Sequence, residues 1–317
     1  MDVWHRRPGG IREVSTLGAG GDSPTLWDHA WVDVDLDKEL ARFRAGEDPI
    51  GREIMRWTRP GSLVLEAGCG SGRILDMLSD AKRLGIGVDF AAGALSKAKA
   101  LRPTLHMMAG DVQAMPFRDG TFDALLSLGL VEHFQKGPAA VLDEHRRVLR
   151  TGGTLIITVP RISPLKRAMD ARLIAGRGSY VSGLGREIRR VSRTEPEVSA
   201  SRHSRFYQYE FSDQDVIGFV RAAGFLPMHW HALGIGFGLS EVRRLGSLIR
   251  HSHSRWEGGA ATKGTYRRQG NSRARGLTVA RDLFGSELGR SWYSRRLLAI
   301  ARRLCGHVLL IVAQADG

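Results

Sequence analysis

Short apolar runs alternate with amphipathic stretches between residues 61 and 160. Five runs have the length of strands, and glycine, proline or charged residues bound them: 62–66, 83–89, 105–111, 122–130 and 153–160. Three stretches between the runs have helical periodicity: 73–81, 91–101 and 139–150. Strands that alternate with helices in this way favour right-handed crossovers and a mostly parallel sheet. The pattern predicts an α/β, doubly wound domain.

The second half of the chain repeats this pattern less regularly. Residues 211–225 are predicted to form a helix and turn, with Ser212 as the N-cap, Asp215 as its capping-box partner and Gly224 as the stop. An apolar run follows at 225–233. Near the end, an amphipathic, basic stretch precedes a last apolar run, in residues 293–306 and 306–314. We expect this helix to pack on the sheet; a membrane-surface anchor is the alternative.

Composition indicates a globular protein without a disulfide framework. Hydrophobic residues make up 42% of the 317 residues and charged residues 25%, and the two cysteines lie far apart. The first residues lack the apolar core of a signal peptide, and the longest apolar run, Val308 to Ala313, is too short to span a bilayer. We therefore expect a soluble, cytoplasmic protein.

The positive charge is concentrated in the second half. Residues 1–160 hold 20 basic and 21 acidic side chains, whereas residues 161–317 hold 27 and 12. Nearly all of the excess is arginine, whose planar guanidinium suits phosphate and carboxylate recognition. An anionic substrate or surface would explain it; a solvated basic face explains it equally well.

Glycines follow the first predicted strand in the pattern E-x-G-x-G-x-G, from Glu66 to Gly72. A Walker A loop needs Gly-Lys-Ser/Thr at its end, and a dinucleotide fingerprint needs a glycine three positions after Gly70; Arg73 breaks both patterns. Closely spaced glycines allow the backbone to approach a ligand without obstruction by Cβ atoms. The same turn also occurs as a plain packing device.

Carboxylates stand at the ends of the next two strands. Asp89 ends the second strand, 17 residues after Gly72, where it can accept hydrogen bonds from ribose hydroxyls. Phe90 follows and can pack on an adenine ring, and Asp111 ends the third strand. Strand-end carboxylates also cap helices. Their order at successive strand ends favours a nucleoside-containing ligand.

Five segments follow one another along the chain: the glycine motif, "GVD", "GDVQAMPF", "FDALLSLGLVEHF" and "RVLRTGGTLIITVP". Together they resemble the class I S-adenosylmethionine-dependent methyltransferases, in particular the group that modifies small molecules. The resemblance covers about residues 60–160. It implies that S-adenosylmethionine is the cofactor, that Asp89 holds its ribose and that Phe90 packs on its adenine. The other implied contacts are with the methionine part (Glu66, Gly68, Gly70, Gly72), the adenine edge (Asp111, Val112) and the sulfonium (Leu128, Gly129).

The resemblance also implies a Rossmann-like sheet of seven strands, with a sixth parallel strand at 225–233 and an antiparallel last strand at 306–314, between the fifth and the sixth. The chain is then an N-terminal extension, residues 1–60, that forms a helical cover, and one methyltransferase domain, residues 61–317. Insertions occupy about 161–210 and 234–304, and we interpret them as a lid over the substrate pocket and a loop.

Histidines and a glutamate supply candidate catalytic groups. In "LVEHF", His133 and Glu132 follow the fourth strand and face the expected cofactor crevice, so His133 is the first candidate for a general base and Glu132 the second. A role in starting the following helix is the alternative. His229 and His231 alternate on a strand and are interpreted as structural, and His251 and His253 lack partners for a metal, so the sequence predicts no metal site.

These features predict a methyltransferase that acts on a small-molecule, carbohydrate or lipid-linked acceptor. An RNA methyltransferase is the first alternative because of the arginine-rich half, although no RNA-binding module or N-P-P-Y-like tetrad is visible. A non-catalytic scaffold that binds the cofactor is the second. The sequence decides neither the acceptor atom nor the oligomeric state.

Overall fold

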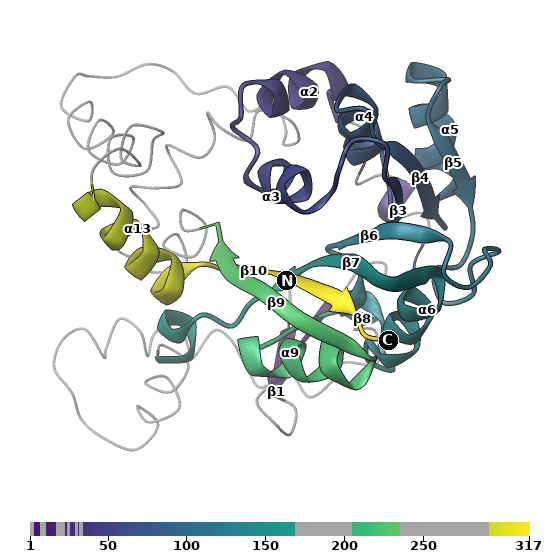
Figure 1. Ribbon diagram of the computed structural model, residues 1–317. Helices are drawn as coiled ribbons and strands as arrows, with labels where there is room; N and C mark the ends of the chain where they lie inside the picture. The colour runs from purple at the N-terminus through teal and green to yellow at the C-terminus, as the bar shows by residue number, and fades with distance from the viewer. Residues whose placement is uncertain are drawn as a thin grey trace, which may run out of the picture.

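The computed structural model describes residues 3–6, 11–16, 23, 26–28, 31, 34–168, 205–234 and 292–317. Its main feature is a sheet of seven strands in the order β5-β4-β3-β6-β7-β10-β9 (Figure 1). The strands are β3 (Leu63–Ala67), β4 (Leu84–Asp89), β5 (His106–Ala109), β6 (Phe122–Leu128), β7 (Leu149–Pro160), β9 (Phe225–Leu233) and β10 (Val308–Ala315).

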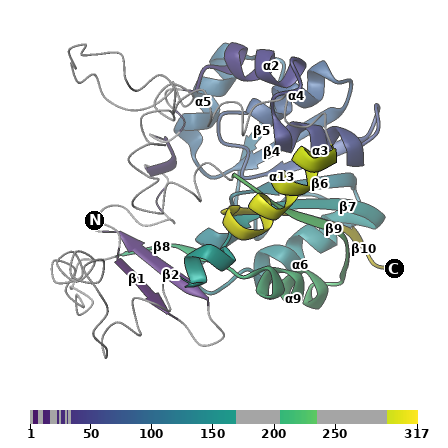
Figure 2. The same cartoon turned by 90° about the vertical axis from the view of Figure 1, so that its left-hand side faces the viewer.

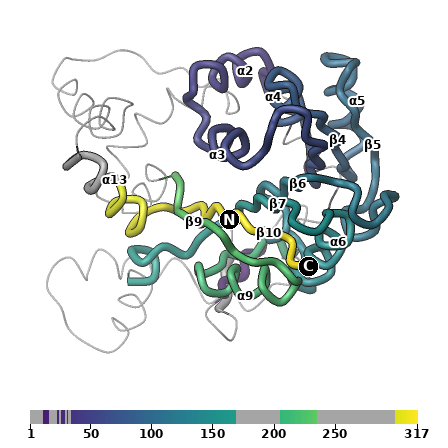
Figure 3. The backbone as a smooth tube through the Cα atoms, in the orientation of Figure 1, coloured from purple at the N-terminus to yellow at the C-terminus, as the bar shows by residue number. Residues whose placement is uncertain are grey.

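This sheet confirms the predicted α/β, Rossmann-like architecture. β3 pairs in parallel with β4 and with β6, β4 pairs in parallel with β5, and β6 pairs in parallel with β7. β10 pairs antiparallel with β7 and with β9. The tube in Figure 3 shows β10 inserted between its two neighbours. β7 begins at Leu149, four residues before the predicted start, because the chain passes from helix to strand without a loop.

Helices cover both faces of the sheet. They are α2 (Leu36–Arg44), α3 (Pro49–Trp57), α4 (Arg73–Asp80), α5 (Ala92–Leu101), a short 3-10 helix η2 (Val131–His133), α6 (Ala139–Val148), α9 (Asp213–Ala222) and α13 (Trp292–Cys305). In the described residues, no helix is long and apolar enough to cross a membrane.

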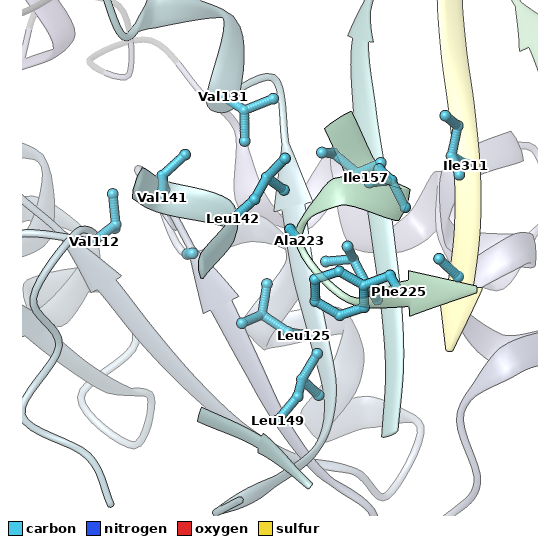
Figure 4. Packing of buried hydrophobic residues seen from close by; sticks show 14 of the residues in the cluster. Val112, Leu125, Val131, Val141, Leu142, Leu149, Ile157, Ala223, Phe225 and Ile311 are labelled. Atoms are coloured by element: carbon cyan, nitrogen blue, oxygen red, sulfur yellow. The ribbon is translucent and has the colours of Figure 1, made fainter. Parts of the chain in front are cut away.

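Successive side chains of each strand point to opposite faces of the sheet, and this produces two apolar cores. On one face, side chains of α6 and α9 such as Val141, Leu142 and Val220 pack on Leu125 and Ile157 (Figure 4). On the other face, α3 and α4 pack on the intervening strand positions, with residues Ile54, Ile74, Leu75, Leu126 and Ile156. Two buried faces explain why the strands are nearly continuous apolar runs.

The predicted helix after residue 211 begins as expected. The Ser212 hydroxyl accepts from the Asp215 backbone N–H at 3.3 Å, and the Asp215 carboxylate accepts from the Ser212 backbone N–H at 2.9 Å, which completes the capping box. Gly224 follows α9 with φ 77°, a left-handed conformation that favours glycine. The turn delivers the chain directly into β9.

A second sheet of three strands was not predicted. β1 (Val3–Arg6), β2 (Arg12–Thr16) and β8 (Arg205–Glu210) pair antiparallel, apart from the main sheet (Figure 2). The N-terminal extension therefore contains strands as well as the helices expected of a cover. β8 comes from the end of the insertion that was predicted to form a lid. Residues 169–204 of that insertion and residues 235–291 of the second lie outside the described residues.

Candidate cofactor and acceptor site

Four neighbouring strands end at one edge of the main sheet. Ala67 of β3 pairs with Val88 of β4 and with Ser127 of β6, and Asp89 pairs with Ala109 of β5. Ligands of open α/β sheets bind at the carboxyl ends of the strands, where the strand order reverses. β3 is the strand from which the order runs in both directions here. All the predicted site residues lie at the ends of these four strands or in the loops that follow them.

The glycine loop after β3 is held against β4. The backbone N–H groups of Gly68 and Cys69 both donate to the Val88 carbonyl, at 2.8 and 3.2 Å. Gly68, Gly70 and Gly72 have φ values of 78°, 47° and 71°. Residues other than glycine rarely adopt these backbone angles. The loop needs glycine for its conformation, which the spacing of the motif alone did not establish.

Asp89 joins this loop to the next helix. Its side chain is 6% exposed. One carboxylate oxygen accepts from the Gly70 N–H and the other from the Ala91 N–H, each at 2.8 Å. A carboxylate has about four lone-pair sites, so two remain for a ligand. Asp89 thus sets the loop conformation and still has acceptor capacity.

The residues predicted to contact adenine follow β4 and β5. Phe90 is 41% exposed, so its ring is accessible to a ligand. Gly110 N–H donates to the Asp89 carbonyl at 3.0 Å, so the start of the β5 loop lies beside Asp89. Asp111 is exposed and caps the Gln113 N–H at 2.9 Å, whereas the Val112 side chain is buried in the core, 7% exposed. Only the backbone of Val112 remains available for base recognition.

Glu66 is a buried carboxyl group at the end of β3. It is 4% exposed, and its Oε2 atom has no hydrogen-bond partner among the described residues. Burial raises the pKa of this group well above its ordinary value, while Arg73 opposes the shift and Asp89 adds to it. A buried acceptor without a partner costs free energy. A cationic or hydrogen-bond-donating ligand would relieve that cost.

Glu132 and His133 form the second part of the site, after β6. Gly129 has φ 67°, and a Cβ atom there would lie 3.7 Å from Glu132 Oε1, so the turn brings Leu128, Gly129 and Glu132 together. Glu132 is 2% exposed, and its Oε2 atom has no partner within the described part of the chain. Burial raises the pKa of Glu132 to about 8.

The contacts of His133 determine which nitrogen carries the proton. Nδ1 lies 2.8 Å from the Tyr207 carbonyl oxygen, which can only accept, so Nδ1 is the protonated nitrogen of the neutral ring. Nε2 then has a lone pair, and it lies 4.0 Å from Glu132 Oε1. Burial lowers the pKa of His133 to about 4, so the ring is neutral at physiological pH.

Three aromatic side chains that were not predicted as site residues contact these groups. The rings of Trp27 and Tyr207 meet His133 edge to face, with centroids 4.7 and 5.3 Å away. The Trp31 ring lies against Gly70. The spacing of the two tryptophans, four residues apart, was a signal of one helical face. Tyr207 belongs to β8 and contacts His133 through both its ring and its carbonyl oxygen.

Replacement of Glu132 with glutamine should change the pH dependence of stability. The folded state holds this proton more tightly than the unfolded state, where the ordinary pKa is 4.5. The stabilisation from Glu132 is therefore complete below pH 4.5 and is lost as pH rises to about 8. We expect the stability of wild type relative to Glu132→Gln to fall by on the order of a few kcal/mol across this interval.

Urea denaturation of both proteins at steps within this interval measures the difference. The opposite contribution of His133, whose low pKa makes stability rise with pH, is common to both proteins and cancels. Parallel pH profiles for wild type and variant would contradict the raised pKa.

One segment of the chain is similar to known proteins. Residues 65–157 match the family model described as "Methyltransferase domain". This segment contains the glycine loop, Asp89, Asp111 and the Glu132–His133 pair.

Curated relatives match over the same part of the chain. A demethylmenaquinone methyltransferase from Beutenbergia cavernae is 40% identical over 101 residues, 31% of this chain and 41% of the relative. A probable tRNA methyltransferase 9B from Bos taurus is 34% identical over 113 residues, 35% of this chain and 24% of the relative. The chain thus spans less than half the length of these two relatives. A putative methyltransferase structure from Bacillus halodurans has 16% identity and a TM-score of 0.46, with 85% of this chain and 99% of that chain covered.

Proposed function

We propose that this chain, whose residues 65–157 match a methyltransferase-domain model, is a class I S-adenosylmethionine-dependent methyltransferase that transfers the methyl group of S-adenosylmethionine to a small-molecule, carbohydrate or lipid-linked acceptor. The observation that carries the proposal is the set of buried acceptors around the glycine loop. Asp89 holds the loop through Gly70 and keeps two lone-pair sites, and Glu66 has an orphaned carboxyl oxygen beside it.

These groups fit the chemistry of the cofactor. The orphaned oxygen of Glu66 suits the ammonium group of the methionine part, because a buried carboxyl gains most from a cationic donor. The free lone pairs of Asp89 suit the two ribose hydroxyls, and the exposed ring of Phe90 suits an adenine face. Cβ atoms at Gly68 and Gly72 would lie 3.0 Å from Leu130 and 2.9 Å from Met107, so both glycines allow the loop to pack closely on the chain itself. When it is bound, S-adenosylmethionine supplies a methyl group on a sulfonium that is already a good leaving group.

The protein must then orient the acceptor and receive its proton. Orientation alone accounts for a large share of such catalysis. In our proposal His133 Nε2 receives the proton, because the Tyr207 carbonyl keeps Nδ1 protonated and leaves the Nε2 lone pair free. Glu132, largely protonated at neutral pH, lies 4.0 Å from Nε2. A nearby cation would lower the pKa of Glu132 and populate its carboxylate form, which could then receive the proton in place of His133.

Replacement of His133 with alanine tests this role. We expect kcat to fall about tenfold to a hundredfold, the lower end of the contribution of a general base, since the low pKa of His133 makes it a weak one. The Kd of the cofactor should not change. In the wild type, kcat/KM should be constant above the His133 pKa of about 4 and fall below it, when Nε2 is protonated.

The exposed histidine of β5, His106, provides the matched control: His106→Ala removes an imidazole remote from η2 and should keep full activity. Full activity of His133→Ala with unchanged cofactor binding would remove His133 from the mechanism. A loss of cofactor binding in that variant would instead indicate a structural role.

RNA is the second candidate acceptor, because one relative is named a probable tRNA methyltransferase and residues 161–317 carry the basic excess. The acceptor class can be identified with methyl-labelled S-adenosylmethionine and a cell extract, followed by separation into lipid, polysaccharide, nucleic-acid and small-molecule fractions. Label in one of the non-nucleic fractions, lost in Asp89→Ala, supports the proposal. Label in RNA, with steep salt dependence, overturns it in favour of the second candidate. Cofactor binding without turnover in any fraction favours a scaffold.

A further inference from the structure

A cluster of metal-binding side chains lies away from the cofactor edge, between α3 and β9. Glu53 of α3 and the two histidines of β9, His229 and His231, each have one donor atom within 4.8 Å of those of the other two. From the sequence, the two histidines were interpreted as structural, and no metal site was predicted. Glu53 lies more than 170 positions earlier in the chain, so its approach became visible only in the fold.

The local structure explains the convergence. His229 and His231 pair with Val312 and Leu310 of β10, whose side chains belong to the core beneath α3 and α4, so both imidazoles face that side. Trp230, between them, pairs with Ile311 of the opposite core. A bulge between Val312 and Ala313 sets this register, in the edge strand that contains Pro227, and edge strands tolerate both features.

The side chains are held in place before any ligand binds. His229 Nε2 and His231 Nδ1 are 3.1 Å apart. His231 Nε2 lies 4.0 Å from Glu53 Oε1, and the two side chains are 24% and 16% exposed. The Trp57 indole N–H donates to the other Glu53 oxygen at 3.2 Å. The Trp57 ring also stacks on His229, at 6.2 Å and 28°.

We propose that Glu53, His229 and His231 form a binding site for a zinc ion, with water as the fourth ligand. Two imidazole nitrogens and one carboxylate oxygen are a common donor set of four-coordinate zinc. Neighbouring ligand atoms of tetrahedral zinc are roughly 3.3 Å apart, close to the spacing of the two histidine nitrogens. The His231 nitrogen in this pair is Nδ1, whereas the 4.0 Å distance to Glu53 Oε1 is measured from Nε2, so the Glu53 side chain must rotate toward Nδ1 to bind the same ion. Trp57 acts as the outer partner that orients the carboxylate.

The surrounding charges favour neutral imidazole and moderate the affinity. Burial lowers the pKa of His231, Glu53 opposes the shift, and His229, Arg302 and Arg56 add to it. Neutral imidazole is the form that binds metal. Arg302 and Arg56 also repel a cation, so the site depends on the single carboxylate of Glu53. The bound ion would join α3 to the edge strand beside α13 (Figure 1).

Zinc titration of the full chain without an affinity tag tests the proposal. We expect one zinc ion per chain, a rise of a few degrees in the unfolding midpoint, and intense visible absorption from tetrahedral cobalt(II) used as a probe. His229→Ala and His231→Ala should lose all three signals, and Glu53→Gln should bind zinc about a hundredfold more weakly. Trp57→Phe, which keeps the stacked ring and loses only the indole N–H, should bind about tenfold more weakly.

His106→Ala is the control, because it removes an exposed histidine at the opposite edge of the sheet. Far-UV circular dichroism and cofactor binding establish that each variant folds, and Glu53→Gln decides the matter if a histidine variant does not fold. Zinc binding that is equal in the wild type and in the Glu53 and His231 variants overturns the proposal. Absence of zinc binding in the wild type overturns it as well.

Discussion

Asp89→Ala should abolish most of the affinity for S-adenosylmethionine. The carboxylate is buried and already fixes the loop through the Gly70 and Ala91 N–H groups. In our proposal it also accepts hydrogen bonds from two ribose hydroxyls. A hydrogen bond to a charged group contributes about 1.5–3 kcal/mol, so the loss of two raises Kd about a thousandfold. The freed glycine loop adds to this loss, because its N–H groups no longer have fixed positions.

Isothermal titration with S-adenosylmethionine measures the change. Asp89→Asn should be intermediate: it keeps one acceptor oxygen but sets an amide N–H against one of the two backbone N–H groups. Asp143→Ala on the exposed surface of α6 is the matched control for a lost carboxylate. A Kd for Asp89→Ala within about threefold of the wild type, well below the value of one charged hydrogen bond, would place the ribose elsewhere.

The main sheet could be predicted because its signals are local. The strands are mostly apolar runs of four to twelve residues that alternate with helices, and the central strands are buried on both faces. The capping box at Ser212 and the stop at Gly224 needed only neighbouring residues. The sheet of β1, β2 and β8 could not be predicted in this way. Its strands have four to six residues, and β2 pairs with a strand almost two hundred positions later.

For the candidate site, too, the residues set by local sequence could be predicted and those set by long-range contacts could not. Glu66 and Asp89 lie at the ends of strands and Glu132 follows one, so their shared edge was a consequence of the fold class. The contacts of Trp27 and Tyr207 with His133 depend on segments outside the βαβ pattern, and no spacing links them. The tautomer of His133 likewise depends on a carbonyl 74 positions away. His229 and His231 were assigned a structural role because Glu53, the carboxylate that lies near them in the fold, is far from them in the sequence.

Gly70 is the position where a single methyl group should have the second large effect. A Cβ atom there would lie 2.6 Å from the Trp31 ring, and the φ of 47° is unfavourable for alanine. The left-handed conformation costs about 1–2 kcal/mol, and overpacking adds about 1–3 kcal/mol. Gly70→Ala can escape these costs only if the loop moves, which breaks the hydrogen bond from Gly70 N–H to Asp89. We therefore expect the cofactor Kd to rise about a hundredfold.

Two further variants separate the causes. Gly46 has φ 71° with nothing within 4 Å of its Cβ position, so Gly46→Ala carries the backbone cost alone, lowers stability slightly and leaves Kd unchanged. In the double variant Trp31→Ala/Gly70→Ala the steric share disappears, and we expect roughly a tenfold recovery of affinity relative to Gly70→Ala. Recovery to that extent would mean that Trp31 packs on the loop in the cofactor-binding state. Purely additive effects of the two substitutions on Kd would mean that the tryptophan leaves the loop before the cofactor binds, because residues in contact couple and separated ones do not.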